Sequence, residues 1–325
     1  MDAARSILAA MAVLLLAAFA PAQAEGEAPS SGTITVVVPI AAGGGMDTIG
    51  RIVAEKLQER LKQPVVVENR VGGGSVVGIN SVARATPDGR TLLLIDVSAV
   101  VTRWLNKSVP FDVIADFAPV ARVASTPLLL FANAALPVGD VRQLIDYAKT
   151  NPGRLTVGTP GVGTPHHLAA AMLNAGAGID ITHVPYRGTA PSLNDLLGGQ
   201  IPLIWATPVA VMPFVEQGKV KVLGSASRER LPRFPQVPTV AESGLPGFNV
   251  DIWFGIAAPA RTPGDLVERL GREIRAIVAL PDVQSRMSAL AYDPDAGSAD
   301  ELRDLIAGDH ARYGAVIREL GIQPN

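Results

Sequence analysis

Two glycine-rich turns carry the residue types and spacing best suited to bind a small anion. Residues 41–45 (AAGGG) follow the β-branched run 33–38 and precede Ile49, Ile52 and Val53 at helical spacing. A turn between a strand and a helix directs free main-chain N–H groups and the positive end of the helix dipole at one point. An anion is favoured there, and glycine lets the backbone approach it closely.

The same pattern returns in the stretch 159–167 (TPGVGTPHH), which follows an apolar strand pattern at 155–158. Pro165 suits the first turn of a helix, and His166 beside it can donate to a ligand. Two such units predict two lobes whose helix starts face one cleft. Open α/β sheets bind ligands outside the carboxyl ends of their strands.

Neither turn fits a nucleotide-binding motif. A P-loop requires G-x-x-x-x-G-K-[ST], but the window that starts at Gly45 has Arg51 and Ile52 in the last two places. A dinucleotide fingerprint requires G-x-G-x-x-G, but the window that starts at Gly43 has Thr48 in the sixth place. The net charge of −2 gives no basic surface for nucleic acid. The expected ligand is therefore a small anion, a carboxylate, held by main-chain groups.

The composition argues against nucleophilic and metal chemistry. The chain has no cysteine, and its four histidines show no H-E-x-x-H spacing. The window from Gly73 to Val77 (GGSVV) lacks the closing glycine of a nucleophile elbow. We expect no catalysis, no metal and no cofactor. The alternative is an enzyme of the same architecture in which Asp47 or His166 acts as acid or base.

Charged side chains near the turns each allow two interpretations. Asp47 lies in the first helical turn, where a carboxylate stabilises the dipole, but it can also bind an amino group or a water of the ligand. Arg70 and Arg187 each follow a strand at the cleft edge. Each is either a solvated residue at the rim or a partner for a second carboxylate of the ligand.

The N-terminus has the pattern of an export signal. Arg5 precedes an apolar run at 7–20, and Ala22-Gln23-Ala24 forms an A-x-A site, which predicts a signal peptide over 1–24 that is cleaved after Ala24. The run is short for a membrane span. Residues 25–32 (EGEAPSSG) read as a flexible leader, so the mature chain is expected in the periplasm.

Continuous apolar strands at 33–38, 64–68 and 91–95, with helical segments between them, predict an α/β fold with a parallel sheet. Right-handed crossovers then place Asp96 and Ser98 beside the first turn. The strand predicted at 252–259 returns the chain to the first lobe. Lobe 1 is therefore predicted as residues 33–124 plus 252–325, and lobe 2 as 125–251, with hinge closure around a ligand.

At the level of whole segments the chain resembles the Bug family, the periplasmic solute-binding proteins of tripartite tricarboxylate transporters. The matching segments, in family order, include VVVPIAAGGGMDTIGRIVAEKL, VVVENRVGGGSVVG, GTPGVGTPHHLA, HVPYRGTAPSLNDLLGGQ and WFGIAAPARTP. The resemblance implies a type II periplasmic binding protein fold, with two lobes of mixed, mostly parallel sheets joined by two crossing strands. It also implies a ligand carboxylate held by N–H groups and small hydroxyls of loops 39–48 and 159–166, and delivery to integral membrane subunits.

Three departures from the family pattern bear on the ligand. Met46 stands where Thr or Ser is usual, Ile40 replaces a frequent Phe or Tyr, and Trp205-Ala206-Thr207 replaces a common Phe-Asp-Asn. A hydroxyl and a carboxylate are thereby lost from the expected pocket. We therefore expect an acid with an apolar or weakly polar body, rather than an amino acid zwitterion.

Residue patterns and resemblance together give one set of candidate ligand-binding residues. They are Pro39, Ile40, Ala41, Ala42, Gly43, Gly44, Gly45, Met46, Asp47, Asp96, Ser98, Gly161, Val162, Gly163, Thr164, His166, Tyr186, Arg187 and Thr207. The expected partners are a small carboxylate and membrane transporter subunits, and we expect a monomer. A receptor that serves a sensor kinase is the alternative assignment.

Overall fold

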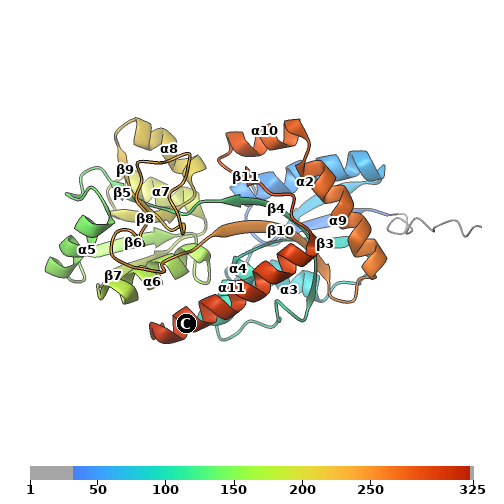
Figure 1. Cartoon of the computed structure of the whole chain (residues 1–325), viewed down its shortest axis with the longest axis horizontal. Helices are drawn as coiled ribbons and strands as arrows, with labels where there is room; N and C mark the ends of the chain where they lie inside the picture. The colour runs from blue at the N-terminus through green and yellow to red at the C-terminus, as the bar shows by residue number, and fades with distance from the viewer. Residues whose placement is uncertain (1–31, 323–325) are drawn as a thin grey trace, which may run out of the picture.

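The computed structural model describes residues 32–322, so the predicted signal peptide and residues 25–31 of the predicted leader lie outside the described residues. Its strands form one sheet of order β11-β4-β10-β3-β1-β2 and a second of order β7-β6-β8-β5-β9. The two sheets lie in separate lobes that are joined by a narrow waist (Figure 1).

The first lobe is built on three parallel strands, each followed by a helix. The strands are β1 (Ile34–Val38), β2 (Val65–Asn69) and β3 (Thr91–Asp96). The helices that follow them are α2 (Gly45–Leu61), α3 (Val76–Ala83) and α4 (Ser98–Leu105). Because β1 pairs in parallel with both β2 and β3, the three strand-to-helix turns share one edge of the sheet.

The second lobe repeats this arrangement. Its parallel strands are β6 (Leu155–Thr159), β7 (Ile181–Pro185) and β8 (Leu203–Ala206), and they lead into α6 (Pro165–Ala177), α7 (Thr189–Leu197) and α8 (Pro208–Glu216). The remaining elements are β5 (Leu129–Asn133), α5 (Val141–Thr150) and β9 (Val220–Ser225). Here too the turns before the helices gather at one sheet edge.

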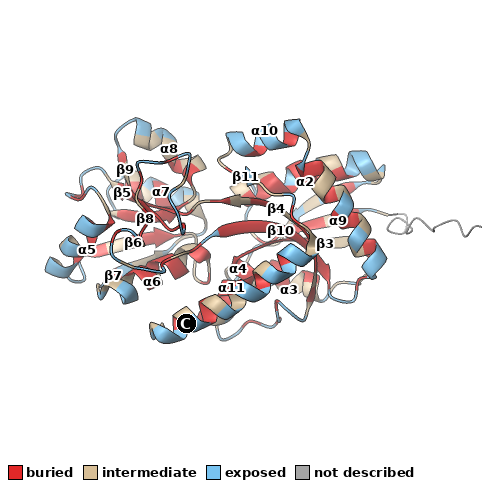
Figure 2. Ribbon diagram, viewed as in Figure 1, coloured by how far each residue is buried: buried red, intermediate tan, exposed pale blue. Residues whose placement is uncertain are grey.

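Two long strands cross the waist. β4 (Phe117–Thr126) leads directly to β5 in the other sheet, and β10 (Ile252–Pro259) brings the chain back and pairs antiparallel with β4. Both are buried along most of their length (Figure 2). Beneath them runs the last helix, α11 (Ala299–Glu319), whose Asp309 accepts a hydrogen bond from the Trp253 indole at 2.8 Å. This hydrogen bond ties the start of β10 to α11.

The sheets are mixed, as expected. The neighbouring parallel strands are β1–β3 and β6–β8, because β10 runs antiparallel to β3 and β4 in the first sheet and β5 runs antiparallel to β8 and β9 in the second. The structure also contains α4, α10 (Pro281–Ala289) and β11 (Asp293–Pro294), which the sequence analysis does not predict. α9 (Gly264–Val278) completes the cover of lobe 1. Within residues 32–322, no helix combines the length and the hydropathy that a bilayer crossing requires.

Candidate functional site

The first glycine turn exposes N–H groups at the start of α2. Gly43 adopts a left-handed φ of 84°, and its N–H donates to Asp47 Oδ2 at 2.9 Å. Gly44 is the N-cap, and no side chain caps it. First-turn N–H groups have no partner inside their own helix, and those of Gly44, Gly45 and Met46 make no other hydrogen bond within the described residues. These three amides are available to a ligand, whereas the Gly43 amide is not.

The second turn has the same local geometry at the start of α6. Gly163 has a φ of 80°, and its N–H donates to Nδ1 of His167 at 3.3 Å. The N-cap, Thr164, accepts from the His167 amide at 3.3 Å and donates its own hydroxyl to Gly161 O at 2.8 Å. The N–H of Gly163 therefore holds the second turn together, as that of Gly43 does in the first.

The two lobes are in contact at these turns. The hydroxyl of Thr102, on α4 of lobe 1, donates to Gly163 O of lobe 2 at 2.9 Å, and the bond is buried. A Cβ on Gly74 would lie 2.3 Å from Val162 O, so only glycine allows this approach. The second turn therefore packs onto helix α4 and onto the loop after β2.

His166 supplies an unused polar group at the start of α6. Its ring is half-buried, and its Nδ1 is fully enclosed without a hydrogen-bond partner in the described residues. Burial lowers the pKa of His166 to about 3. The imidazole is therefore neutral at physiological pH and can offer one N–H to a ligand.

Behind the second turn lie two stacked imidazoles. The rings of His167 and His183 are 4.1 Å apart at their centroids, and His183 Nε2 lies 2.6 Å from the hydroxyl of the buried Thr159. Burial, followed by the neighbouring His167, lowers the pKa of His183 to about 4, and burial also lowers that of His167. Both histidines therefore help to hold the second turn in place.

Asp47 serves the protein itself. It is 3 % exposed and accepts from Gly43 N–H, from Arg51 at 2.9 and 3.1 Å, and from Asn69 at 2.9 Å. Burial alone would raise the pKa of Asp47, but the hydrogen bonds from Arg51, Gly43 and Asn69 hold it below its usual range. Of the two interpretations of Asp47, the geometry supports the structural one.

Asp96 and Ser98 lie at the edge predicted for them, but they satisfy each other. Both the N–H and the hydroxyl of Ser98 donate to the Asp96 carboxylate, at 3.1 and 3.0 Å. Burial raises the pKa of Asp96 to about 6, against the lowering effect of the Ser98 hydrogen bonds. This pair fixes the entry of the chain into α4, the helix that carries Thr102.

The remaining candidates divide by exposure and partner. Tyr186 donates its hydroxyl to Asp195 at 2.7 Å, and Thr207 caps α8 without using its side chain. Arg70 is paired with Glu68, whereas Arg187 is exposed and has no partner within the described residues. Two candidates are buried, Pro39 and Met46. The half-buried candidates are Ile40, Gly44, Gly45, Gly161, Val162 and Thr164. The exposed candidates are Ala41, Ala42 and Gly43. The side chain of Met46 belongs to the hydrophobic core, so its thioether does not take the place of the usual Thr or Ser hydroxyl at the ligand.

Two residues near the turns escape the sequence analysis. Thr102 lies within α4, a helix that the sequence analysis does not predict, and Tyr292 follows α10 far along the chain. A Cβ on Gly45 would lie 1.7 Å from the Tyr292 hydroxyl, so this tyrosine touches the start of α2. No sequence motif indicates that either residue belongs to the site, because only the tertiary fold brings it there.

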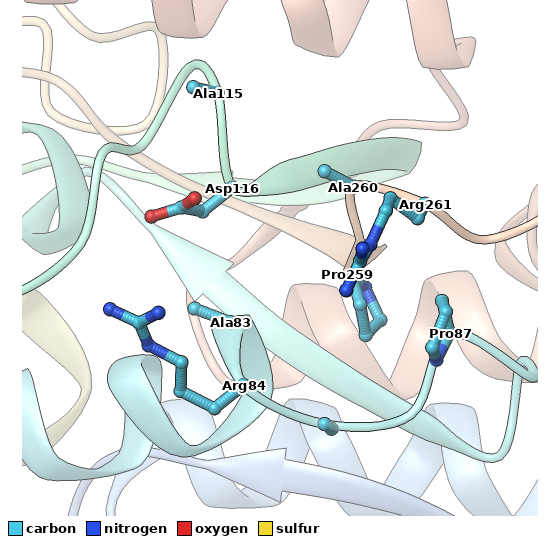
Figure 3. Close-up of a pocket in the computed structure, with 9 residues that line it drawn as sticks. Ala83, Arg84, Pro87, Ala115, Asp116, Pro259, Ala260 and Arg261 are labelled. Carbon is cyan, nitrogen blue, oxygen red and sulfur yellow. The ribbon is translucent and has the colours of Figure 1, made fainter.

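A surface hollow of about 320 Å³ lies elsewhere, where β10 ends and β4 begins (Figure 3). Its charged groups are exposed or already committed: Arg84 donates to Pro110 O, and Asp116 accepts from the Asp112 amide. The turns contain free amides and an enclosed, unpartnered imidazole nitrogen, so they are the better candidate site. Among residues 32–322, no three His, Asp or Glu side chains are grouped to hold a metal ion.

Comparison with known proteins agrees with this geometry. The family described as "Tripartite tricarboxylate transporter family receptor" matches residues 49–322. A protein encoded in the tcbD-tcbE intergenic region of Pseudomonas sp. strain P51 is 38 % identical over 99 % of this chain and 96 % of its own length. BugT of Bordetella pertussis is 32 % identical over 97 % of each chain.

Solved structures resemble the chain equally well. An R. palustris protein solved with adipate is 31 % identical, with a TM-score of 0.83 over 90 % of this chain and 98 % of that one. MatC from Rhodopseudomonas palustris, solved with malate, is 33 % identical, with a TM-score of 0.81 over 88 % and 98 %. The predicted Bug resemblance and the two-lobed binding-protein fold are confirmed, and the chain belongs to the tripartite tricarboxylate transporter family of receptors.

Proposed function

We propose that this receptor captures a small organic acid between its two glycine turns, in the periplasm, and delivers it to the membrane subunits of a tripartite transporter without chemical change. The observation that carries the proposal is the set of unpartnered donors at the two helix starts. These are the amides of Gly44, Gly45 and Met46 on one side and the His166 imidazole on the other. Adipate and malate in the related structures are acids of the expected kind.

Charge at the turns supports a carboxylate rather than an amino acid. Asp47 is fully used by Gly43, Arg51 and Asn69, so it offers no site for an ammonium group. Asp96 is likewise occupied by Ser98. The ligand is therefore an acid whose body is apolar or weakly polar. If it carries a second carboxylate, the candidate partner is Arg187, which is exposed and has no partner within the described residues.

The affinity that such a site can reach follows from its donors. A hydrogen bond to a charged group contributes about 1.5–3 kcal/mol, and three or four of them must also offset the costs of association and closure. A dissociation constant on the order of micromolar is the result. No arginine in the pocket is needed for that value.

The proposal includes the organisation of the chain. Lobe 1 is residues 33–124 plus 252–325, lobe 2 is 125–251, and the waist formed by β4 and β10 is the hinge. The mature protein begins after cleavage at Ala24. N-terminal sequencing of the exported protein tests the cleavage site.

Native mass spectrometry of freshly purified protein, followed by calorimetric titration with adipate, malate, benzoate, aspartate and glutamate, tests the function. We expect a co-purified acid and binding of at least one simple acid near micromolar. Tighter binding of aspartate or glutamate than of every simple acid would contradict the proposed ligand class. Conversion of the bound acid to a product would instead establish the enzyme alternative. Failure to associate with any transporter subunit would favour a sensor kinase partner.

A further inference from the structure

We propose that Tyr292 is a further ligand-contacting residue, whose hydroxyl donates a hydrogen bond to the carboxylate held at the start of α2. The inference rests on the proposed function, because it names a donor of the same site. Nothing in the sequence near Tyr292 resembles a binding motif, and the residue lies far from both glycine turns along the chain.

The position of Tyr292 is defined by its contact with Gly45. An ideal Cβ on Gly45 would lie 1.7 Å from the Tyr292 hydroxyl oxygen and 2.9 Å from Cζ. The hydroxyl therefore occupies the space where a side chain on the first residue of α2 would begin. Gly45 also supplies one of the amides available to the ligand, so the hydroxyl lies beside a residue whose N–H makes no other hydrogen bond within the described residues.

The hydroxyl itself is unpaired. Tyr292 is only 2 % exposed, yet its oxygen makes no hydrogen bond within residues 32–322. Its ring is enclosed, but the oxygen is not one of the fully enclosed polar atoms that lack a partner, so it keeps some accessible surface. A tyrosine hydroxyl on an almost buried ring normally finds a partner. The first turn of α2 presents N–H donors, which cannot accept the phenolic proton. A carboxylate oxygen held by those N–H groups would accept it.

The ring is fixed from both crossing strands. Tyr292 packs edge-on against Phe254 of β10, with centroids 5.5 Å apart. The preceding residue, Ala291, has a left-handed φ of 58°, and its carbonyl accepts from the Thr126 hydroxyl at the end of β4, at 3.1 Å. The Tyr292 amide donates to Met287 O at 3.0 Å. The hydroxyl is thus held in place before a ligand arrives, which lowers the entropic cost of binding.

The protonation state suits a donor. Burial raises the pKa of Tyr292 to about 12, so the phenol keeps its proton at every physiological pH. A neutral phenol donates one hydrogen bond and adds no charge. The site thereby gains a donor without gaining a cation.

Calorimetric titration of wild type, Tyr292→Phe and Tyr147→Phe with adipate, malate and benzoate tests the inference. Phenylalanine keeps the ring, so the melting temperature of the ligand-free protein should not fall. The affinity of Tyr292→Phe for the acid that wild type binds should drop about 10-fold to 100-fold, the value of one hydrogen bond to a charged group. Tyr147, half-buried on the distant helix α5, is the matched control, and its variant should bind as wild type does.

The outcomes separate the two proposals. Wild type and Tyr292→Phe binding the same acid equally would overturn the role of Tyr292 and leave the receptor function intact. Wild type binding none of the acids would overturn both. If Tyr292→Phe does not fold, wild-type protein labelled with ¹³C at tyrosine Cζ replaces it. Of its four tyrosine signals, the one that persists in each of the other three Tyr→Phe variants belongs to Tyr292. That signal should shift on addition of the acid, and an unchanged signal would contradict the contact.

Discussion

The main-chain N–H of Gly163 donates to Nδ1 of His167 at 3.3 Å, and the other lobe contains the equivalent bond, from Gly43 to Asp47 at 2.9 Å. Each glycine has a left-handed φ, near 80°, and each acceptor side chain lies four positions further on, in the first turn of the helix. One N–H group of each turn therefore holds the turn in its conformation, and the N–H groups that follow it are available to the ligand. The acceptor is an anion in lobe 1 and a neutral imidazole in lobe 2, which predicts different responses to mutation and to pH.

The first prediction concerns Asp47. Asp47→Ala leaves Gly43 N–H, Arg51 and Asn69 without their shared acceptor, so we expect a loss of about 1–3 kcal/mol in unfolding free energy, together with weaker binding. Asp47→Asn retains one oxygen acceptor and should lose less of both. Urea denaturation and calorimetric titration of the two variants measure the effects. An alanine variant with full stability but no binding would instead assign Asp47 to the ligand.

Both glycine turns could be predicted because their signal is local. Continuous apolar strands, glycine and helical spacing follow one another within a short window at residues 33–53, and the structure contains β1, the turn and α2 there. The direction of the strands also follows from the helices between them. What local pattern cannot reveal is which amide is already bonded, because that depends on where the Asp47 and His167 side chains point.

The contacts of Thr102 and Tyr292 could not be predicted from the sequence for a different reason. Thr102 reaches Gly163, and Tyr292 reaches Gly45, only because the crossing strands bring distant segments together. Helix α4 was missed because Ser98–Leu105 is buried on nearly every side and so lacks the alternation that marks an amphipathic helix. Met46 was interpreted from its neighbours in the turn, but its side chain points into the core.

A second prediction tests the bond between the two lobes. The Thr102 hydroxyl donates to Gly163 O across the interface, and the bond is buried. Thr102→Val keeps the volume but removes the donor, which should disfavour closure by about 1 kcal/mol and weaken ligand binding about fivefold. Thr102→Ser restores a hydroxyl and should bind as wild type does. Equal affinities for the valine and serine variants in titration calorimetry would show that the bond does not contribute to closure.

A third prediction concerns the close approach of Gly45 and Tyr292. Gly45→Ala places a methyl group where the phenol lies, and the buried ring cannot move freely, so unfolding free energy should fall by about 1–3 kcal/mol. Adding Tyr292→Phe removes the atom in closest contact, so the double variant should recover part of that loss. Chemical denaturation of both single variants and the double variant gives the coupling energy. Strictly additive losses would mean that the two residues do not touch.

The last prediction is a pH dependence that arises from the histidines behind the second turn. An unfolded histidine has a pKa near 6.5, whereas burial, with His167 as neighbour, lowers the pKa of His183 to about 4, and burial also lowers that of His167. Between these values the unfolded chain binds more protons than the folded one, so stability falls as pH falls from about 6.5 to about 4, and it is complete above that range. Each pKa unit of difference is worth ~1.4 kcal/mol.

His167→Asn isolates this contribution. Its amide oxygen can still accept from Gly163 N–H, but it does not titrate and it removes one of the two stacked imidazoles. Urea denaturation between pH 7.5 and 4.5 should therefore show a smaller loss of stability for the variant than for wild type. Because protonated His167 can no longer accept from Gly163, ligand affinity should also fall at low pH in wild type more than in the variant. Parallel curves for the two proteins would place the acid sensitivity in groups other than His167, namely His166, His183 or the carboxylates.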